Sequence, residues 1–363
     1  MTHRELFIII WTLYTIFICL CWIYLYNQLF SVNKYRSYYY PVLAIVCVFG
    51  VFGILSNDFF NYARIMYMMQ NYGIPVGVEI PYLFIAQFAN FDNITFRACI
   101  FIPATIGLCI IFKKYSIKPS ITVALFFILF YLNFITTVRS SFADVFFFLG
   151  ALYFIKKKNI RRFLIFLLTT TLCCFFHDSG FMLLLPFLLA LPNLGRNNIK
   201  IYLYLLPLGI IVARVLIGMV FSNFFDESGY VENTAYLSGS WKLRDYMYNS
   251  VMFSLFSYTL WKNRNILYQK MSLNKYIYQY AFFVFYIWII LYCSGVSRYV
   301  ASRFLFHNFI LLAIFFANSL QNKSKQYKTI VLALSGCAVI ITEFAIFTTY
   351  RDFMAFFRDV FLV

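Results

Sequence analysis

Charged residues are scarce in this chain, and their scarcity argues against a soluble protein. Only 12% of the 363 residues are charged and 63% are hydrophobic, whereas a soluble domain carries about a quarter charged residues. Apolar runs of about 18–20 residues, the length that crosses a hydrocarbon core, recur along the sequence. No segment between them is long enough for a soluble domain. The sequence therefore predicts one all-α membrane domain, residues 1–363, that acts in or at the bilayer.

Motifs that bind nucleotides and metals are missing as well. The sequence has no glycine-rich phosphate loop, no His-x-x-x-His pair and no Asp-x-Asp pair. The nine cysteines lie mostly inside apolar runs without metal-ligand spacing, as small buried residues do. We therefore expect no cofactor, no metal site and no nucleotide-sugar donor.

Twelve transmembrane spans are predicted from the apolar runs, with outer loops at about 57–93 and 222–246. We interpret the first of these loops as holding interfacial pieces. The alternative is that Ile80 to Phe91 crosses the membrane, which would invert the first two helices. The predicted spans are about 6–28, 38–56, 94–112, 119–137, 140–155, 163–176, 179–191, 201–221, 247–261, 277–295, 303–319 and 328–348.

Basic residues predict the orientation of these spans. The loop with Lys156, Lys157, Lys158, Arg161 and Arg162 is cytoplasmic by the positive-inside rule. Loops on that side collect 19 of the 30 basic residues, and all thirteen acidic residues lie on the other side or within spans. Orientation thus explains the net charge of +17. Nucleic-acid binding, which needs a basic face on a soluble fold, is not expected.

Arginine dominates among the basic residues outside the cytoplasmic loops. Ten of these eleven residues are arginine, whereas the cytoplasmic loops hold 14 lysines and 5 arginines. A guanidinium group stays charged and can grip a phosphate through two donors. The alternative is that these arginines only reach the membrane surface from outer helix ends. Taken as a set, they favour phosphate binding at the outer face.

Arg139 lies at an outer turn, in the segment Thr136 to Ser141, and Asp144 follows about one turn into the next span. An ionisable group at that depth usually faces a polar cavity. The alternative is a structural ion pair between Arg139 and Asp144.

His177-Asp178-Ser179-Gly180 interrupts a long apolar stretch on the same side. Histidine can take a proton from a sugar hydroxyl near neutral pH, and Asp178 would orient it. The alternative is a structural histidine. The order of Asp178 and Ser179 is not that of a nucleophile elbow, so a serine hydrolase is not predicted.

Two further arginine sites lie later in the chain. A late outer turn holds Arg298, Tyr299 and Arg303, and a bend there would bring both guanidinium groups to one diphosphate. Arg214 lies inside a predicted span and needs a partner in a water-filled cavity or a route to the surface.

Two early outer segments place a carboxylate beside aromatic residues. Asp58 precedes Tyr62 by four residues, and Glu79 precedes Tyr82 by three. Such pairs suit stacking on a sugar ring combined with binding of its hydroxyls. The alternative is an ordinary interfacial aromatic belt.

These turns, in this order, resemble the EpsG-type branch of the bacterial polysaccharide polymerases, the Wzy-like O-antigen and exopolysaccharide polymerases. Asp58-Phe59-Phe60-Asn61-Tyr62 resembles the Asp-aromatic-x-x-Tyr element of that family. Glu79-Ile80-Pro81-Tyr82 is similar to its acidic element with a following tyrosine, with isoleucine and proline where glycine is often found.

The later segments extend this resemblance. Arg139-Ser140-Ser141-Phe142-Ala143 matches the family's Arg-Gln-x-x-Ala turn except that serine replaces the glutamine. The basic loop Lys156 to Arg162 and His177-Asp178-Ser179 fit its short basic loop and its His-x-Ser turn. Arg298 to Arg303 is similar to its arginine-bearing late turn.

The resemblance implies a metal-independent glycosyltransferase with GT-C-like membrane architecture. Such an enzyme polymerises lipid-linked repeat units of O-antigen or another surface polysaccharide at the periplasmic face of the bacterial inner membrane. Its donor is a glycan on undecaprenyl diphosphate, and a hydroxyl of the next lipid-linked unit attacks the anomeric carbon. A chain-length regulator is a candidate partner.

Within that mechanism, the main electrostatic demand is the charge of the leaving diphosphate, for which Arg139, Arg298 and Arg303 are candidates. His177 is the candidate base or a further phosphate ligand, with Asp178 as its orienting group and Asp58 as the alternative base. The candidate substrate-binding residues are Arg298, Arg303, Arg214, Tyr62, Glu79 and Tyr299.

Two other functions use similar features. A flippase for lipid-linked sugars should show charged residues along a path through the membrane, and mid-span charge is scarce here. An O-antigen ligase uses the same donor but usually has a larger outer loop than residues 222–246.

The predicted topology can be tested by cysteine labelling. Single cysteines placed within residues 222–246 of a cysteine-free variant should react with a membrane-impermeant maleimide from the periplasmic side only. A cysteine in the loop 156–162 is the control, and it should react only after the membrane is opened. Labelling of residues 222–246 from the cytoplasm would overturn the topology.

Overall fold

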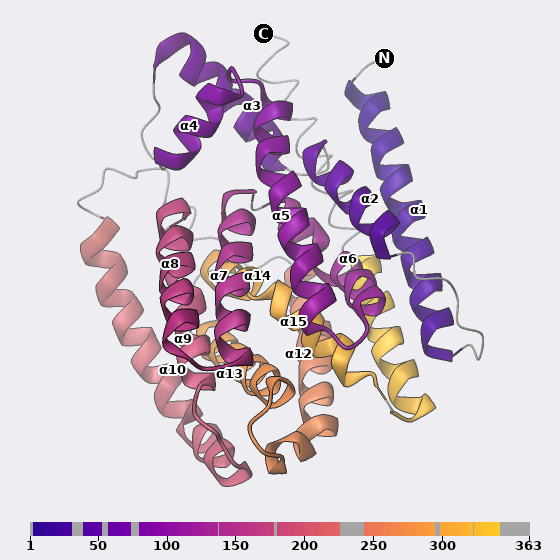
Figure 1. Cartoon of the computed structure of the whole chain (residues 1–363), viewed down its shortest axis with the longest axis vertical. Helices are drawn as coiled ribbons and strands as arrows, with labels where there is room; N and C mark the ends of the chain where they lie inside the picture. Colours follow the sequence, from indigo (N-terminus) through magenta and orange to yellow (C-terminus); the bar gives the residue numbers. More distant parts are fainter. Residues whose placement is uncertain are drawn as a thin grey trace.

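Helices make up all the regular structure in the part of the chain that the structure describes (Figure 1). This computed structural model describes residues 3–30, 39–52, 57–73, 80–136, 138–177, 180–225, 243–294, 298–321 and 323–341. No strand occurs in these ranges, and the predicted all-α class is confirmed. The helices are α1 (His3–Phe30), α2 (Tyr39–Val51), α3 (Asn57–Tyr72), α4 (Ile80–Phe88), α5 (Asn93–Tyr115), α6 (Pro119–Thr136), α7 (Val138–Lys156), α8 (Ile160–Phe176), α9 (Phe181–Ala190), α10 (Arg196–Phe225), α12 (Leu243–Asn263), η3 (Arg264–Tyr268, a 3-10 helix), α13 (Leu273–Cys293), α14 (Arg298–His307), α15 (Phe309–Ser319) and a last helix over residues 325–341.

Several of these helices can cross a membrane. Within the described residues, four are long and apolar enough to do so, or five if the bent pair α14–α15 counts as one. The prediction of twelve spans and of a GT-C-like architecture is not confirmed. One reason is length, because α2 has 13 residues and α9 has 10, whereas a bilayer core needs about 20. The four are Trp11–Phe30, Asn93–Tyr115, Asn197–Val215 and Leu273–Cys293.

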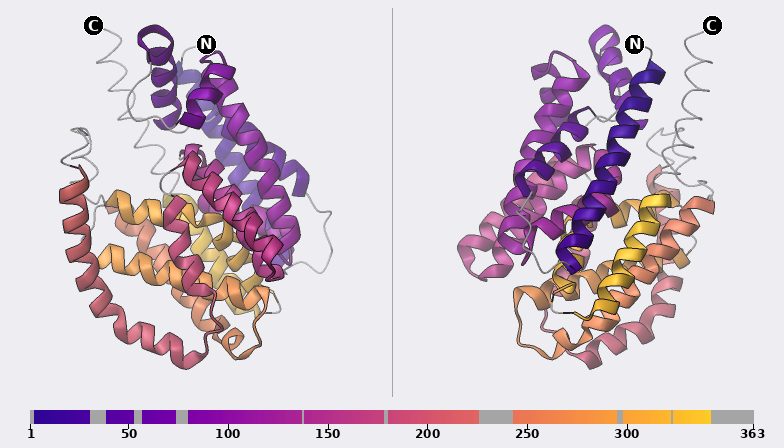
Figure 2. Two further views of the ribbon diagram at one scale, coloured as in Figure 1. Left: turned by 60° about the vertical axis from the view of Figure 1, so that its left-hand side comes forward. Right: turned by 90° about the vertical axis from the view of Figure 1, so that its right-hand side faces the viewer.

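Two helices, α3 and α4, occupy the predicted outer loop 57–93. They lie beyond the end of the main bundle, where α4 packs against α5 and α8 and α3 packs against α5 and α6 (Figures 1 and 2). With 16 and 9 residues, both are shorter than a span. This arrangement fits the interpretation of the segment as interfacial pieces. We call this end of the bundle the α3–α4 end.

A capped turn folds α4 back against α5. Asn90 and Phe91 have left-handed backbone angles, with φ of 50° and 58°. The Oδ2 atom of Asp92 then accepts a hydrogen bond from Thr95 N at 2.7 Å, which satisfies a free amide of the first turn of α5. The hydrogen bonds from Thr95 hold the pKa of the Asp92 carboxyl below its usual value. The turn thus fixes α4 above the ends of α5 and α8.

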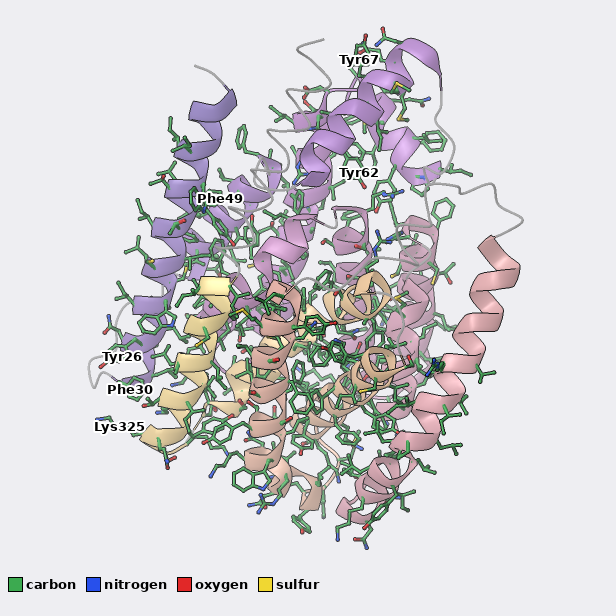
Figure 3. The ribbon with its side chains drawn as sticks, turned by 180° about the vertical axis from the view of Figure 1, so that it is seen from behind. Tyr26, Phe30, Phe49, Tyr62, Tyr67 and Lys325 are labelled. Carbon is green, nitrogen blue, oxygen red and sulfur yellow. The ribbon has the colours of Figure 1, made fainter. Side chains whose placement is uncertain are left out.

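The predicted cytoplasmic loops meet at the opposite end, which we call the basic end. Lys328 Nζ donates to Leu29 O at 3.2 Å, and Ile117 N donates to Asn318 Oδ1 at 3.0 Å. Tyr26, Phe30 and Lys325 lie together there, far from Tyr62 and Tyr67 of α3 (Figure 3). Further contacts between these loops are Lys113–Tyr40, Lys158–Leu191 and Lys323–Lys262. The basic loops gather at one end of the bundle, as expected if successive loops alternate between the two sides of the membrane.

The helix is interrupted between α14 and α15, whereas the sequence predicts one continuous span over residues 303–319. The two helices are bent by 66° at Asn308, which is fully buried. Its Nδ2 donates to Phe304 O at 2.6 Å, and its Oδ1 accepts from Tyr280 Oη of α13 at 2.6 Å. A polar side chain with tertiary partners therefore stabilises the break. As a result, α14 lies between α6, α7, α9 and α13 in the middle of the bundle.

Helix α10 runs along the outside of the bundle (Figure 2). Ile199 is the one buried residue among the described side chains of Asn197–Val215, and the main contacts of the helix are with α13 and η3. Arg214 is exposed on this helix. An apolar helix without a buried face is suited to lipid contact.

Tyr280→Phe tests the stabilisation of the break. Without the tyrosine hydroxyl, the buried Asn308 Oδ1 loses its donor, and this costs about 1–3 kcal/mol. We expect a lower unfolding temperature in detergent micelles, measured by circular dichroism. Tyr202→Phe is the control, because no hydrogen bond from Tyr202 is found among the described residues. Equal unfolding temperatures for the two variants would contradict this account.

Candidate active site

A buried pair of polar side chains, Asp144 and His307, joins α7 to α14. Nδ1 of His307 lies 2.9 Å from Asp144 Oδ1 and 3.1 Å from Asp144 Oδ2. The side chains are 3% and 7% exposed, respectively. Since a carboxylate only accepts, the shared proton belongs to Nδ1, which leaves Nε2 of a neutral His307 as an acceptor. The alternative considered for Asp144 is an ion pair with Arg139, whereas the contact found for Asp144 among the described residues is with His307.

His177 completes this cluster from the end of α8. Its ring centre lies 6.0 Å from that of His307. His177 ends the helix, and its backbone N–H donates to Cys173 O at 2.9 Å. The chain turns back at Gly180, where a Cβ atom would come within 2.7 Å of Cys173 Sγ. The turn thus needs glycine, and it leaves His177 half-buried at the α3–α4 end of the bundle.

Arg139 lies at the same end, at the start of α7, among tyrosines of α3 and α4. Its carbonyl oxygen accepts a hydrogen bond of 2.6 Å from Tyr82 Oη. Its guanidinium carbon lies 6.0 Å from the centre of the Tyr62 ring, within the range of a cation–π contact. Tyr62 also stacks on Phe96 of α5 at 5.7 Å. Because Arg139 is half-buried, these rings restrict where its charged group can lie.

Phe176 connects the arginine and histidine parts of the site. Its ring centre lies 5.8 Å from that of Tyr82, 5.0 Å from Phe142 and 5.9 Å from Phe146. The next residue is His177. Four segments distant in sequence, around positions 62, 82, 139 and 177, therefore converge at one end of the bundle.

The other predicted site residues have different positions. Arg303 is exposed on α14, one helical turn before His307. Arg214 is exposed on α10, on the outside of the bundle. Asp178 and Glu79 lie outside the described residues. Only the backbone is described for Asp58 in α3 and for Arg298 and Tyr299 in α14.

One arginine of the predicted outer set has a structural role. Arg97 is fully buried and donates to Gly50 O at 2.8 and 3.1 Å and to Ile135 O at 3.3 Å. It also lies over the Phe101 ring at 5.1 Å. Its charge is used to join α2, α5 and α6, so it does not belong to a phosphate site.

His307 is the functional candidate that the sequence interpretation missed. It lies within the predicted span 303–319, whose apolar pattern gives this histidine no functional role. Two signals were present. Asp144 is an acidic residue inside a span, which requires a partner, and His307 follows Arg303 by four residues, so both lie on one face of a helix.

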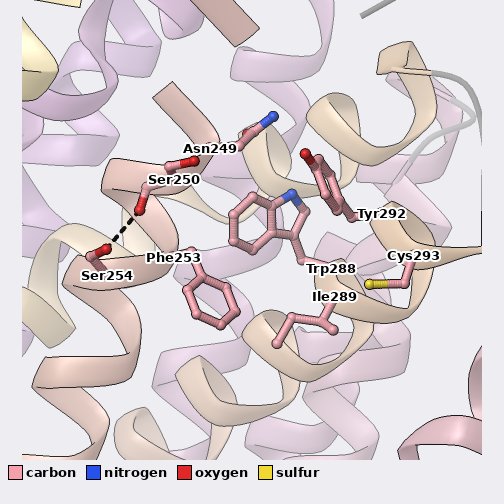
Figure 4. Close-up of a pocket in the computed structure, with 8 residues that line it drawn as sticks. All are labelled: Asn249, Ser250, Phe253, Ser254, Trp288, Ile289, Tyr292 and Cys293. Atoms are coloured by element: carbon pink, nitrogen blue, oxygen red, sulfur yellow. Dashed lines mark hydrogen bonds between the residues drawn. The ribbon is translucent and has the colours of Figure 1, made fainter. Parts of the chain in front are cut away.

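A separate recess of about 300 Å³ lies between α12 and α13 (Figure 4). Trp288 and Tyr292 line it on one side, and Asn249 and Phe253 face them from α12. The remaining lining residues are Ser250, Ser254, Ile289 and Cys293. Its walls are mainly apolar, and it is built from helices other than those that carry Arg139 and His177.

Comparison with known proteins gives one family. The sequence model of the EpsG family matches residues 35–358, nearly the whole chain. No curated protein and no solved structure shows a significant match. The matched range includes every residue of the cluster described above.

Phe176→Ala tests the role of this ring in joining the two parts of the site. Helices in lipid are held by close packing, and removal of a partly buried ring should cost about 2 kcal/mol. Phe175→Ala is a matched control, because Phe175 is the preceding residue and its side chain is 55% exposed. We expect a clear loss of unfolding temperature for Phe176→Ala only. Equal losses would contradict the account.

Proposed function

Because this chain belongs to the EpsG family, whose members have a polysaccharide polymerase-like function, we propose that it polymerises lipid-linked oligosaccharide repeat units. It transfers the growing glycan from undecaprenyl diphosphate to the next repeat unit, which is itself linked to undecaprenyl diphosphate. The α3–α4 end then faces the periplasm, and the protein lies in the bacterial inner membrane.

The observation that carries this proposal is the placement of an arginine and a histidine at the same end of the bundle. Arg139 and His177 lie at the same end of two adjacent helices, and the aromatic rings of Tyr82 and Phe176 connect them. Transfer from a lipid diphosphate needs both groups, because one charge must be stabilised on the leaving group and one proton removed from the attacking hydroxyl.

The reaction then proceeds as follows. A hydroxyl oxygen of the incoming unit attacks the anomeric carbon of the donor, and its proton passes to His177. The bond between that carbon and the diphosphate oxygen breaks, and the electron pair leaves with undecaprenyl diphosphate. Arg139 stabilises the added negative charge, and Arg303, exposed one turn before His307, is the second candidate. Guanidinium groups supply this counter-charge without a metal ion.

The carbohydrate and the lipid occupy different surfaces in this proposal. Tyr62 and Tyr82 present aromatic rings beside Arg139, which suits a sugar ring next to a diphosphate. The apolar recess between α12 and α13, or the unburied face of α10, suits an isoprenoid chain. Asp144, a mid-span acid, is also bonded to His307 in the buried interior, whereas a flippase path needs such charges along an open route through the membrane.

Arg139→Ala tests the proposed function. We expect the purified protein in nanodiscs to extend a lipid-linked repeat unit with EDTA present. Chain extension by Arg139→Ala should fall by about 10²–10³-fold, because a donor to the developing charge is lost. Arg139→Lys should recover part of the activity, since it keeps the charge but not the planar fork.

Lys156→Ala is the matched control, because Lys156 is exposed at the other end of the same helix. It should extend chains like the wild type. Normal extension by correctly inserted Arg139→Ala would reject the role of the arginine. A strict need for a divalent ion would reject the metal-independent reaction.

A further inference from the structure

One of the three histidines in the chain, His307, contacts a buried carboxylate, and the ring of a second, His177, lies 6.0 Å from the His307 ring. We propose that Asp144 and His307 are positioning residues for His177: the pair orients this histidine and stabilises the positive charge it gains when it takes the acceptor proton. This inference rests on the proposed function and adds two residues to it. They come from α7 and α14, which are 163 residues apart at the contact.

The distances to Asp144 indicate which ring nitrogen of His307 donates a hydrogen bond. Both carboxylate oxygens of Asp144 lie within hydrogen-bond distance of Nδ1, so this nitrogen carries the proton. Nε2 of His307 then remains as the acceptor on the other side of the ring. The His177 ring lies 6.0 Å away between ring centres, with a tilt of 50°, so the two imidazole rings are close neighbours.

The surroundings make Asp144 the dominant charge at this position. The helices α6, α9 and α15, which pack around α14 or beside it, contain no Asp, Glu, His, Lys or Arg within their bounds. Among the side chains that the structure describes, Cys173 of α8 and Tyr280 of α13 also lie near the pair, and Arg303 lies one turn earlier on α14. A carboxylate in such an apolar interior acts strongly on a neighbouring imidazole because little water screens it.

Stability alone is a weak reason for this pair. A buried ion pair contributes little net stability, and apolar residues of similar volume often replace it at no cost. The break between α14 and α15 is already held by Asn308 and Tyr280. A carboxylate behind an imidazole is, in contrast, a recurrent way to orient a base and to stabilise its protonated form.

The proton balance is simple. The acceptor hydroxyl loses its proton to His177 as the new bond to the anomeric carbon forms. His177 is then an imidazolium, whose charge is offset by Asp144 through His307. His177 then gives the proton to the departing diphosphate or, once that group has left, to water. It is then ready for the next unit.

Asp144→Asn and His307→Gln test the inference by kinetics. Each should lower kcat of chain extension by about 10²-fold, the size of a general-base contribution, with KM changed less than twofold. Tyr280→Phe is the structural control, since it weakens the α14–α15 break but leaves the Asp144–His307 hydrogen bond. It should keep kcat within twofold of the wild type. A kcat unchanged in Asp144→Asn, or lowered equally in Tyr280→Phe, overturns the proposal.

A spectroscopic signature tests the same inference without an assay. With ¹⁵N-histidine labelling and His3→Gln, only His177 and His307 give side-chain signals. We expect the Nδ1–H tautomer for neutral His307, its loss in Asp144→Asn, and a shifted His177 signal in His307→Gln. The Nε2–H tautomer in the wild type, or an unmoved His177 signal, overturns the proposal. If the wild-type protein extends no glycan, the proposed function is wrong. The spectra then still test whether Asp144, His307 and His177 interact.

Discussion

An ionisable side chain inside an apolar helical bundle is tolerated only with a partner, and the architecture of this protein follows that constraint. Asp144 is paired with His307 at 2.9 Å, and Arg97 donates to backbone carbonyls of α2 and α6. The first pair ties α14 to α7, and Arg97 ties α5 to its neighbours. The Asp144–His307 contact joins helices 163 residues apart, and Arg97 joins α5 to α2 and to the following helix α6.

Around these contacts, the two ends of the bundle differ in composition and in use. The basic end is rich in lysine and is closed by hydrogen bonds between loops, such as that from Lys328 to Leu29. The α3–α4 end holds Arg139 and His177 among tyrosine and phenylalanine rings. Lysine suits an anionic membrane surface, whereas a fixed guanidinium suits a diphosphate. This asymmetry supports a reaction confined to one face of the membrane.

The sequence predicted the all-helical class, because apolar runs report helices of a membrane protein directly, but not the number of spans. It also singled out Arg139 and His177 as polar interruptions of such runs. It did not predict the break at Asn308, since a lone asparagine in an apolar run has no local signal and the 66° bend depends on Tyr280, 28 residues away. For the same reason it missed His307, whose partner is known only once α7 and α14 are placed together. The helical form of α3 and α4 also required tertiary contacts, because α4 is only nine residues long.

Whether this protein polymerises repeat units is tested most directly by the surface polysaccharide of a strain that lacks its gene. Gel electrophoresis separates the attached glycans by the number of repeat units. If the protein joins lipid-linked units, the deletion strain should still attach single repeat units but no longer chains, and the intact gene should restore the ladder. Complete loss of attached repeats would identify a flippase or a ligase instead, and an unchanged ladder would contradict the account.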